Sequence, residues 1–209
     1  MMKHMDYNAL ASPTNLEVTI KALTKKQYQV HKVPNGAGAL AKIKEIVPTD
    51  ASVISGTSYS LKQIGFTDLL KSGQHEWRNL QAEILAEKDI EKQRNLRRQA
   101  SLADYYLGSV HALITNGEFI VASNTGNQLP SLVYNAKNLI LVVSTKKIVA
   151  TMDAGFDRLE KHVVPLENTR SQSAYGSDTS LNKIVIFKNE NPYSGRKVHI
   201  ILVDEDLGF

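Results

Sequence analysis

The chain has 209 residues, of which 42% are hydrophobic and 22% are charged, the balance of an ordinary globular protein. It contains no cysteine, which excludes disulfides, thiolate zinc sites, cysteine nucleophiles and iron–sulfur ligation within this chain. The net charge is a mild +4, no apolar run approaches the roughly 20 residues of a membrane span, and the N-terminus lacks a secretory signal, so we expect a cytoplasmic protein.

The N-terminal half predicts helices and strands in alternation. Ser12-Pro13 is a favourable helix start, and apolar residues at helical spacing predict a helix over residues 13–26. An alternating strand is expected at 28–33, a second helix follows, and residues 51–55 form a buried strand. Residues 77–103 are polar and free of Pro and Gly, which predicts one long helix.

The C-terminal half predicts more strands. Asn116-Gly117 indicates a hairpin turn into a strand at 118–123. Residues 138–144 are nearly all apolar, which is typical of a strand buried on both faces in a parallel sheet. A helix with an apolar stripe is expected over 148–163. Two strands, at 183–187 and 197–203, then follow without a helix between them.

This alternation predicts an α/β fold: a mostly parallel sheet with flanking helices and an antiparallel C-terminal strand pair. The chain has no internal repeat, low-complexity tract or linker-like segment. We therefore expect residues 1–209 to form a single domain.

The first candidate site is the loop after the predicted strand at 51–55. Ser55, Gly56, Thr57 and Ser58 place a glycine and several hydroxyls ahead of a helix start. Close backbone approach, free N–H groups and hydroxyls make a good cradle for phosphate or carboxylate. The loop is not a P-loop, because G-x4-G-K-[ST] is absent. An ordinary strand-to-helix turn with a capping hydroxyl explains the same residues equally well.

The second candidate site is the polar loop of Asn124, Thr125, Gly126 and Asn127, which follows the strand at 118–123. In an open α/β sheet, ligands bind beyond the carboxyl ends of strands, where such loops gather. A capped turn with a left-handed glycine explains the composition equally well. Two similar loops in one chain favour a shared site.

A third candidate is Lys147, which follows the most buried predicted strand and could pair with an anionic ligand, although such a lysine is more often a solvated loop charge. Serine hydrolase and dinucleotide-binding motifs are absent: there is no G-x-S-x-G and no G-x-G-x-x-G. The six histidines are scattered, so no metal site is predicted.

Several segments, in their order along the chain, resemble the LUD domain family, also known as DUF162. Residues 53–65 resemble its G-x-S-x-T-L-x-x-I-G segment, residues 103–112 its A-D-x-x-(L/I) segment, and Thr125-Gly126-Asn127 its T-G-N loop. Further resemblance is found at residues 139–149, 165–170 and 203–209. The match covers about residues 35–209, leaving the helix and strand expected in residues 1–34 outside it.

The resemblance implies a fold related to ribose-phosphate isomerase, glucosamine-phosphate isomerase and CoA transferases. It also implies a role near L-lactate oxidation, where a subunit of this type accompanies iron–sulfur partner proteins. Because this chain has no cysteine, any cluster would belong to a partner, and we expect no cofactor here. CoA transferases use a glutamate nucleophile. Thr115 stands where many relatives have an acidic residue, so covalent CoA transfer is not expected.

Two functions remain open. The first is an accessory or ligand-binding subunit of L-lactate utilisation, which holds a small anionic metabolite between loops 55–60 and 124–128 with Lys147 supplying charge. The second is a stand-alone enzyme acting on a phosphorylated or carboxylated metabolite, with Asp104 or Glu118 as general base. Nucleic-acid binding ranks last, because the basic excess is small. We expect neither nucleic acid nor membrane as a partner, and a homo-oligomer is compatible with the sequence.

Overall fold

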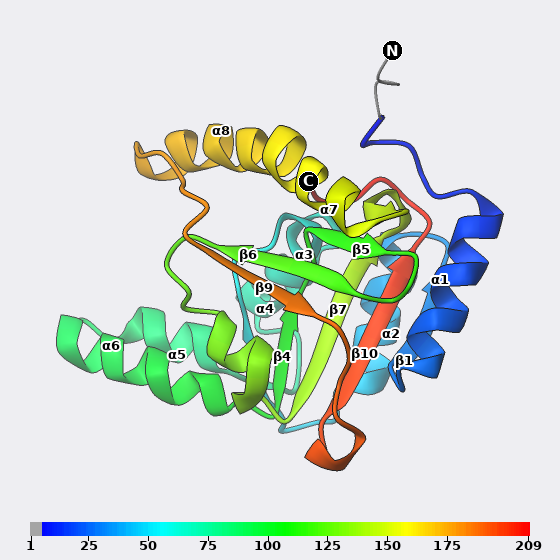
Figure 1. Ribbon diagram of the computed structural model, residues 1–209. Coiled ribbons are helices and arrows are strands. Elements are labelled where there is room, and N and C mark those ends of the chain that lie inside the picture. The colour runs from blue at the N-terminus through cyan, green and yellow to red at the C-terminus, as the bar shows by residue number, and fades with distance from the viewer. Residues whose placement is uncertain (1–5) are drawn as a thin grey trace.

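Two β-sheets and the surrounding helices make up the computed structural model, which describes residues 6–209 (Figure 1). The larger sheet has six strands in the order β1-β10-β7-β4-β2-β3, and all of its pairings are parallel. Its strands are β1 (Gln29–Val33), β2 (Ser52–Ser55), β3 (Arg78–Asn79), β4 (Tyr105–Gly108), β7 (Asn138–Ser144) and β10 (Lys197–Val203).

The smaller sheet has four strands in the order β8-β5-β6-β9. These are β5 (Ala112–Ile114), β6 (Phe119–Ser123), β8 (Ile148–Val149) and β9 (Lys183–Phe187). β6 is antiparallel to both of its neighbours, whereas β8 is parallel to β5. The β5–β6 hairpin turns at Asn116-Gly117 as expected, with Gly117 at φ +83°.

Eight α-helices lie among residues 6–209. They are α1 (Pro13–Lys25), α2 (Gly36–Ile46), α3 (Tyr59–Gln63), α4 (Phe66–Ser72), α5 (Leu80–Ala86), α6 (Ile90–Gln99), α7 (Met152–Arg158) and α8 (Val164–Tyr175). A π-helical turn, Leu159–Val163, joins α7 to α8, and a second forms Ser131–Asn135. Short 3₁₀ turns occupy Ala100–Leu102, Thr145–Lys147 and Pro192–Ser194.

Strand β7 lies inside the larger sheet, and all of its residues are buried. Leu139, Leu141 and Val143 belong to one hydrophobic cluster, whereas Ile140 and Val142 belong to another. A strand that is covered on both faces has no polar side, which explains its continuous apolar run.

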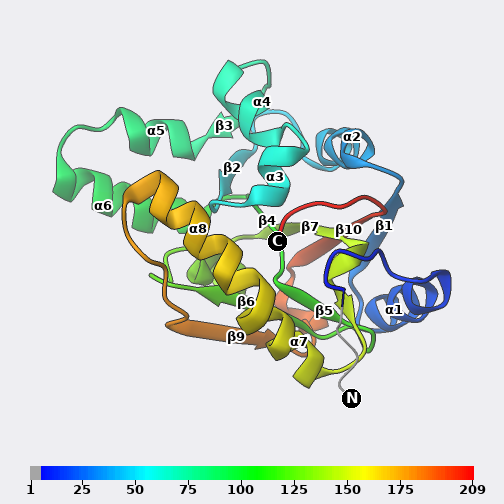
Figure 2. The ribbon, with the colours of Figure 1, turned by 90° about the horizontal axis from the view of Figure 1, so that it is seen from above.

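The layers around the larger sheet are seen in Figures 1 and 2. Helices α2, α3 and α4 cover one face through residues such as Ile43 and Phe66. Helix α1 and the smaller sheet, including Phe119, cover the other face. Leu159 and Val163 then pack on the outer face of the smaller sheet. The α/β class and the mostly parallel sheet are therefore confirmed.

Local signals placed several elements correctly. The Ser12 hydroxyl caps α1 by accepting from the N–H of Asn15, and the Asn35 side chain caps α2 by accepting from the N–H of Gly38. The predicted helix over 148–163 begins only at Met152, because residues 148–149 pair with β5 as strand β8.

Two expectations were wrong. The long helix over 77–103 is divided into the short strand β3 and helices α5 and α6, because Asp89 ends the run by capping α6 through the N–H of Lys92 at 2.9 Å. The antiparallel C-terminal strand pair does not form. β9 pairs antiparallel with β6, whereas β10 lies parallel between β1 and β7 in the other sheet.

Candidate functional site

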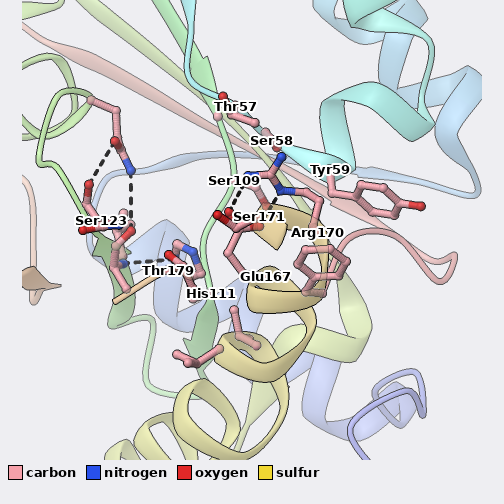
Figure 3. Close-up of a pocket in the computed structure, with 18 of the residues that line it drawn as sticks. Thr57, Ser58, Tyr59, Ser109, His111, Ser123, Glu167, Arg170, Ser171 and Thr179 are labelled. Carbon is pink, nitrogen blue, oxygen red and sulfur yellow. Dashed lines mark hydrogen bonds and ion pairs between the residues drawn. The ribbon is translucent and has the colours of Figure 1, made fainter. Parts of the chain in front are cut away.

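A cavity of about 430 Å³ opens at the carboxyl ends of β2, β4 and β6 (Figure 3). Helix α8, seen from above in Figure 2, contributes to its wall. Its walls come from the loop after β2, the residues after β4, the loop after β6, Lys147, and α8 with the segment that follows it. β2 and β4 are parallel neighbours in the larger sheet, so the segments that follow them meet at one edge, whereas the loop after β6 comes from the smaller sheet.

The two loops singled out from the sequence meet in this cavity. Thr57 and Ser58 line it on one side, and Asn124, Thr125 and Asn127 line it on another. Lys147 lines it as well, so six of the nine predicted ligand-binding residues are brought together. The other three, Ser55, Gly56 and Gly126, do not line the cavity.

The positions of two glycines have structural reasons. A Cβ on Gly56 would lie 2.6 Å from the hydroxyl oxygen of Tyr106, so only glycine lets this buried ring approach the loop. Gly126 has φ +85° and donates its N–H to the Ser123 hydroxyl at 2.8 Å, which shapes the turn after β6. Both therefore support the loops without lining the cavity.

The two candidate general bases lie outside the cavity. Asp104 precedes β4, at the opposite edge of the sheet, and accepts hydrogen bonds from the Ser52 hydroxyl at 2.6 Å and the Ser52 N–H at 3.1 Å. These bonds lower the pKa of the Asp104 carboxyl. Glu118 lies in the turn between β5 and β6 and does not line the cavity. Neither residue is placed to act on a ligand there.

Lys147 lies at the floor of the cavity and is only 3% exposed, so it is not the solvated loop charge that its sequence position suggested. Its Nζ lies 3.0 Å from the Ser109 hydroxyl, 3.1 Å from the Ser60 hydroxyl and 3.2 Å from the Val110 carbonyl oxygen. Burial, followed by the nearby charges of Arg158 and Lys146, holds the pKa of Lys147 well below its ordinary value.

Arg158 is a buried cation that the sequence analysis did not single out. It is fully buried, and its Nη1 donates to the His111 carbonyl oxygen at 2.6 Å. Its Nε and Nη2 have no hydrogen-bond partner among residues 6–209. Burial lowers the pKa of the guanidinium to about 10, so it is still charged at neutral pH.

His111 lies on the cavity wall between the two sheets (Figure 3). Its Nδ1 accepts the N–H of Ala122 at 3.0 Å, which requires that nitrogen to be unprotonated. Burial, together with the charges of Lys147 and Arg158, lowers the pKa of His111 to about 3. The imidazole is therefore neutral at physiological pH.

An ion pair on α8 faces the cavity (Figure 3). The Nε and Nη2 of Arg170 donate to the two carboxylate oxygens of Glu167, both at 2.7 Å. This pairing raises the pKa of Arg170 further. The remaining guanidinium nitrogen, Nη1, is not used in this pair and can donate to a ligand.

Residues 6–209 contain no group of three or more His, Asp or Glu side chains placed to hold a metal ion. None of the helices in the same span is both long and apolar enough to cross a bilayer.

The family model of the LUD domain matches residues 16–203. The chain belongs to the LUD domain family. The match includes most of α1 and all of β1, which lay outside the resemblance seen in the sequence. The family takes its name from lactate utilisation, so this LUD domain is related to lactate-utilisation proteins in general.

A solved structure has the same fold. The crystal structure of a DUF162 family protein from Deinococcus radiodurans has a TM-score of 0.57 to this LUD domain, at 12% sequence identity. The alignment covers 93% of this chain and 99% of that one. No curated protein sequence matches the chain.

Proposed function

We propose that this LUD domain binds a small anionic metabolite in the cavity beneath α8, as an accessory or ligand-binding subunit of L-lactate utilisation that carries no redox centre of its own. The observation that carries this proposal is an imbalance of buried charge. Lys146 and Arg158 are buried cations next to residues that line the cavity: Lys146 precedes Lys147, and Arg158 bonds to the carbonyl oxygen of His111. In contrast, no Asp or Glu among residues 6–209 is buried.

The imbalance is only partly compensated by the protein. Lys146 forms an ion pair with Asp206, whose side chain is 60% exposed. Arg158 has one carbonyl acceptor and two unpaired nitrogens. Burying a cation is costly unless it is paired. The positive potential of these buried cations therefore favours an anion in the adjacent cavity.

The polar groups of the cavity wall are mostly neutral or basic, and its two carboxylates are Glu167, which is paired with Arg170, and Asp178. Hydroxyls and an amide come from Thr57, Ser58 and Asn127, and α8 adds the Nη1 of Arg170, which the pair with Glu167 does not use. Such groups suit a carboxylate or phosphate oxygen, since each can donate a hydrogen bond to it. A chain without cysteine would leave electron transfer to iron–sulfur partner proteins.

A thermal-shift measurement at fixed ionic strength tests the proposal, with L-lactate, pyruvate and inorganic phosphate as the probes. We expect at least one to raise the melting temperature of the wild-type protein, because a ligand that binds only the native state stabilises it. The double variant Thr57→Ala with Asn127→Ala should fold normally and lose that shift.

The matched control is Thr14→Ala with Asn95→Ala, which removes the same two residue types from exposed positions on α1 and α6. It should keep the full shift. Equal shifts in the two double variants would contradict a site between the two loops.

A stand-alone enzyme acting on a phosphorylated or carboxylated metabolite is the second candidate. One observation favours it: the buried Lys147 amine contacts the Ser109 hydroxyl within the cavity. Turnover by the isolated chain would support this candidate, whereas co-purification with cysteine-rich redox proteins would support the accessory subunit.

A further inference from the structure

Ser109 follows β4 at the carboxyl edge of the larger sheet and is partly exposed on the cavity wall (Figure 3). Lys147 lies buried behind it, with 3.0 Å between Nζ and the Ser109 Oγ. A partly exposed hydroxyl in front of a buried amine is an arrangement in which the amine can take the hydroxyl proton.

The Lys147 Nζ donates to all three of its partners, which suits the three N–H groups of a protonated lysine. The neutral amine that a general base requires has two N–H donors and one lone pair. The Val110 carbonyl oxygen, at 3.2 Å, can only accept, and the Ser60 hydroxyl accepts at 3.1 Å. In the neutral amine these two acceptors take both N–H groups, which leaves the lone pair facing the Ser109 Oγ, 3.0 Å away.

The Ser109 hydroxyl can reach this lone pair without movement of heavier atoms. At rest it donates to the Val142 carbonyl oxygen at 2.6 Å. Rotation about the Cβ–Oγ bond of Ser109 turns the proton towards Lys147, because hydroxyl rotors adopt whichever acceptor is available.

The surroundings keep water away from the amine. A Cβ on Gly208 would lie 2.3 Å from the Ser60 Oγ and 2.7 Å from the Lys147 Nζ, so the C-terminal segment covers this pair closely. Ser60 is 1% exposed, which leaves Ser109 as the hydroxyl that a ligand can reach. Burial and the charges of Arg158 and Lys146 lower the pKa of Lys147, which raises the fraction of neutral amine.

We propose that Ser109 is a nucleophile and Lys147 its general base, and that the pair hydrolyses a small carboxylic ester held in the cavity. This rests on the proposed function only in that an anionic group on the ester would be held by the loops and α8. The Ser109 Oγ bonds to the ester carbonyl carbon, its proton passes to the Lys147 Nζ, and the carbonyl π pair moves to oxygen.

Collapse of this tetrahedral species restores the carbonyl and breaks the bond to the leaving alcohol, which takes the proton from Lys147. Water then attacks the acyl group on Ser109 and gives a proton to Lys147. That proton returns to the Ser109 Oγ as the acid departs. The sum is ester plus water giving acid plus alcohol, with no oxidant or reductant.

A neutral alkyl fluorophosphonate tests the pair, with intact-mass and peptide mass spectrometry as the readout. We expect one label per chain on the wild-type protein, at Ser109, and none at that peptide in Ser109→Ala. Lys147→Met should label at least about 100-fold more slowly, the range of a lost general base. Ser72→Ala, at the exposed end of α4, should label at the wild-type rate.

The pH dependence of wild-type labelling gives a second readout that needs no variant. The labelling rate should rise with pH and level off, with a midpoint below 10.5, the ordinary pKa of lysine. If the folded wild-type protein is not labelled, or if labelling persists in Ser109→Ala, the pair is not a nucleophile and base. A rate that rises only above pH 10.5 would also overturn it.

The fluorophosphonate carries no charge, so its reaction with Ser109 does not depend on anion binding in the cavity. Labelling of Ser109 without any anion binding would overturn the proposed function alone. Anion binding without labelling would overturn the pair alone.

Discussion

At the scale of single residues, Lys147 lines the cavity and Arg158 bonds to the carbonyl oxygen of His111 on its wall. Both side chains are buried, and no Asp or Glu among residues 6–209 is buried with them. The burial of these two side chains was not predicted from the sequence, although Lys147 was a candidate ligand-binding residue. Arg158 directly precedes Leu159 in an amphipathic stretch, where a basic residue normally faces solvent. Lys147 follows a buried strand, and only the packing of Ser60, Ser109 and residue 208 shows that it points inward.

Replacement of Arg158 by Met should affect binding more than stability. The substitution loses the hydrogen bond to the His111 carbonyl oxygen, but it also removes the cost of burying a guanidinium with two unpaired nitrogens. Because these two effects oppose each other, the free energy of unfolding should change by less than about 1 kcal/mol. Affinity for the anion should fall about fivefold or more, measured by calorimetry. Arg94→Met, on the exposed α6, is the control and should leave the affinity unchanged. Unchanged affinity in Arg158→Met would show that the buried charge does not reach the ligand.

Gly208 and Gly73 offer a matched pair of substitutions. Both have positive φ, +73° and +67°, but a Cβ on Gly208 would meet Ser60 and Lys147, whereas Gly73 has nothing within 4 Å. Gly73→Ala should cost about 1 kcal/mol through the backbone alone. Gly208→Ala should cost about 1–3 kcal/mol more, from overpacking. Urea unfolding of the two variants measures the difference, and equal losses would mean that the C-terminal segment is not packed on Lys147.

At the scale of elements, helix capping and strand burial could be predicted from the sequence, whereas the pairing of strands could not. Ser12 and Asn35 correctly indicated the starts of α1 and α2, and the apolar run of β7 correctly indicated a central strand. β9 and β10 both look like ordinary apolar strands, and their assignment to different sheets depends on partners far away in the sequence. Asp89 was missed as a helix start because it lies within a polar stretch without Gly or Pro.

Asp89→Ala should loosen α6 without unfolding the protein. The carboxylate caps the helix through the N–H of Lys92, and an N-cap is worth about 1 kcal/mol. No residue of α6 is buried, so little packing holds the helix once the cap is lost. We expect faster hydrogen exchange of the α6 amides with unchanged exchange in β7. Unchanged exchange in α6 would mean that the cap does not hold the helix.

At the scale of the whole molecule, the meeting of the segments after β2 and β4 follows from their parallel pairing in the larger sheet. The position of the loop after β6 beside them does not, because β6 lies in the smaller sheet and is antiparallel to both of its neighbours. The other wall of the cavity could not be predicted from the sequence either. It comes from α8 and from the smaller sheet, whose packing against the larger one is set by contacts such as that of Phe119 with Tyr28. His111 belongs to this missed wall.

Two buried histidines should make the protein less stable in acid. The folded-state pKa is about 3 for His111 and about 4 for His199, both lowered chiefly by burial from the ordinary 6.5. Below pH 6.5 these two histidines therefore bind protons in the unfolded chain but not in the folded protein, so the free energy of unfolding decreases as the pH falls. From pH 6.5 to pH 5 each histidine should account for about 1.5 kcal/mol of that loss. Urea unfolding at both pH values checks this. In His111→Gln the free energy of unfolding should fall less between pH 6.5 and pH 5 than in the wild-type protein. An equal fall in the two proteins would show that His111 does not titrate as described.

The most direct test of the anion site is a two-dimensional amide NMR titration of the isotope-labelled protein with phosphate and with L-lactate, at constant ionic strength. We predict that the peaks that move with saturation come from residues 57–60, 108–111 and 123–128 and from α8. Shifts confined to the basic helix α6, or an absence of saturable shifts with either anion, would contradict binding of a small anion in this cavity.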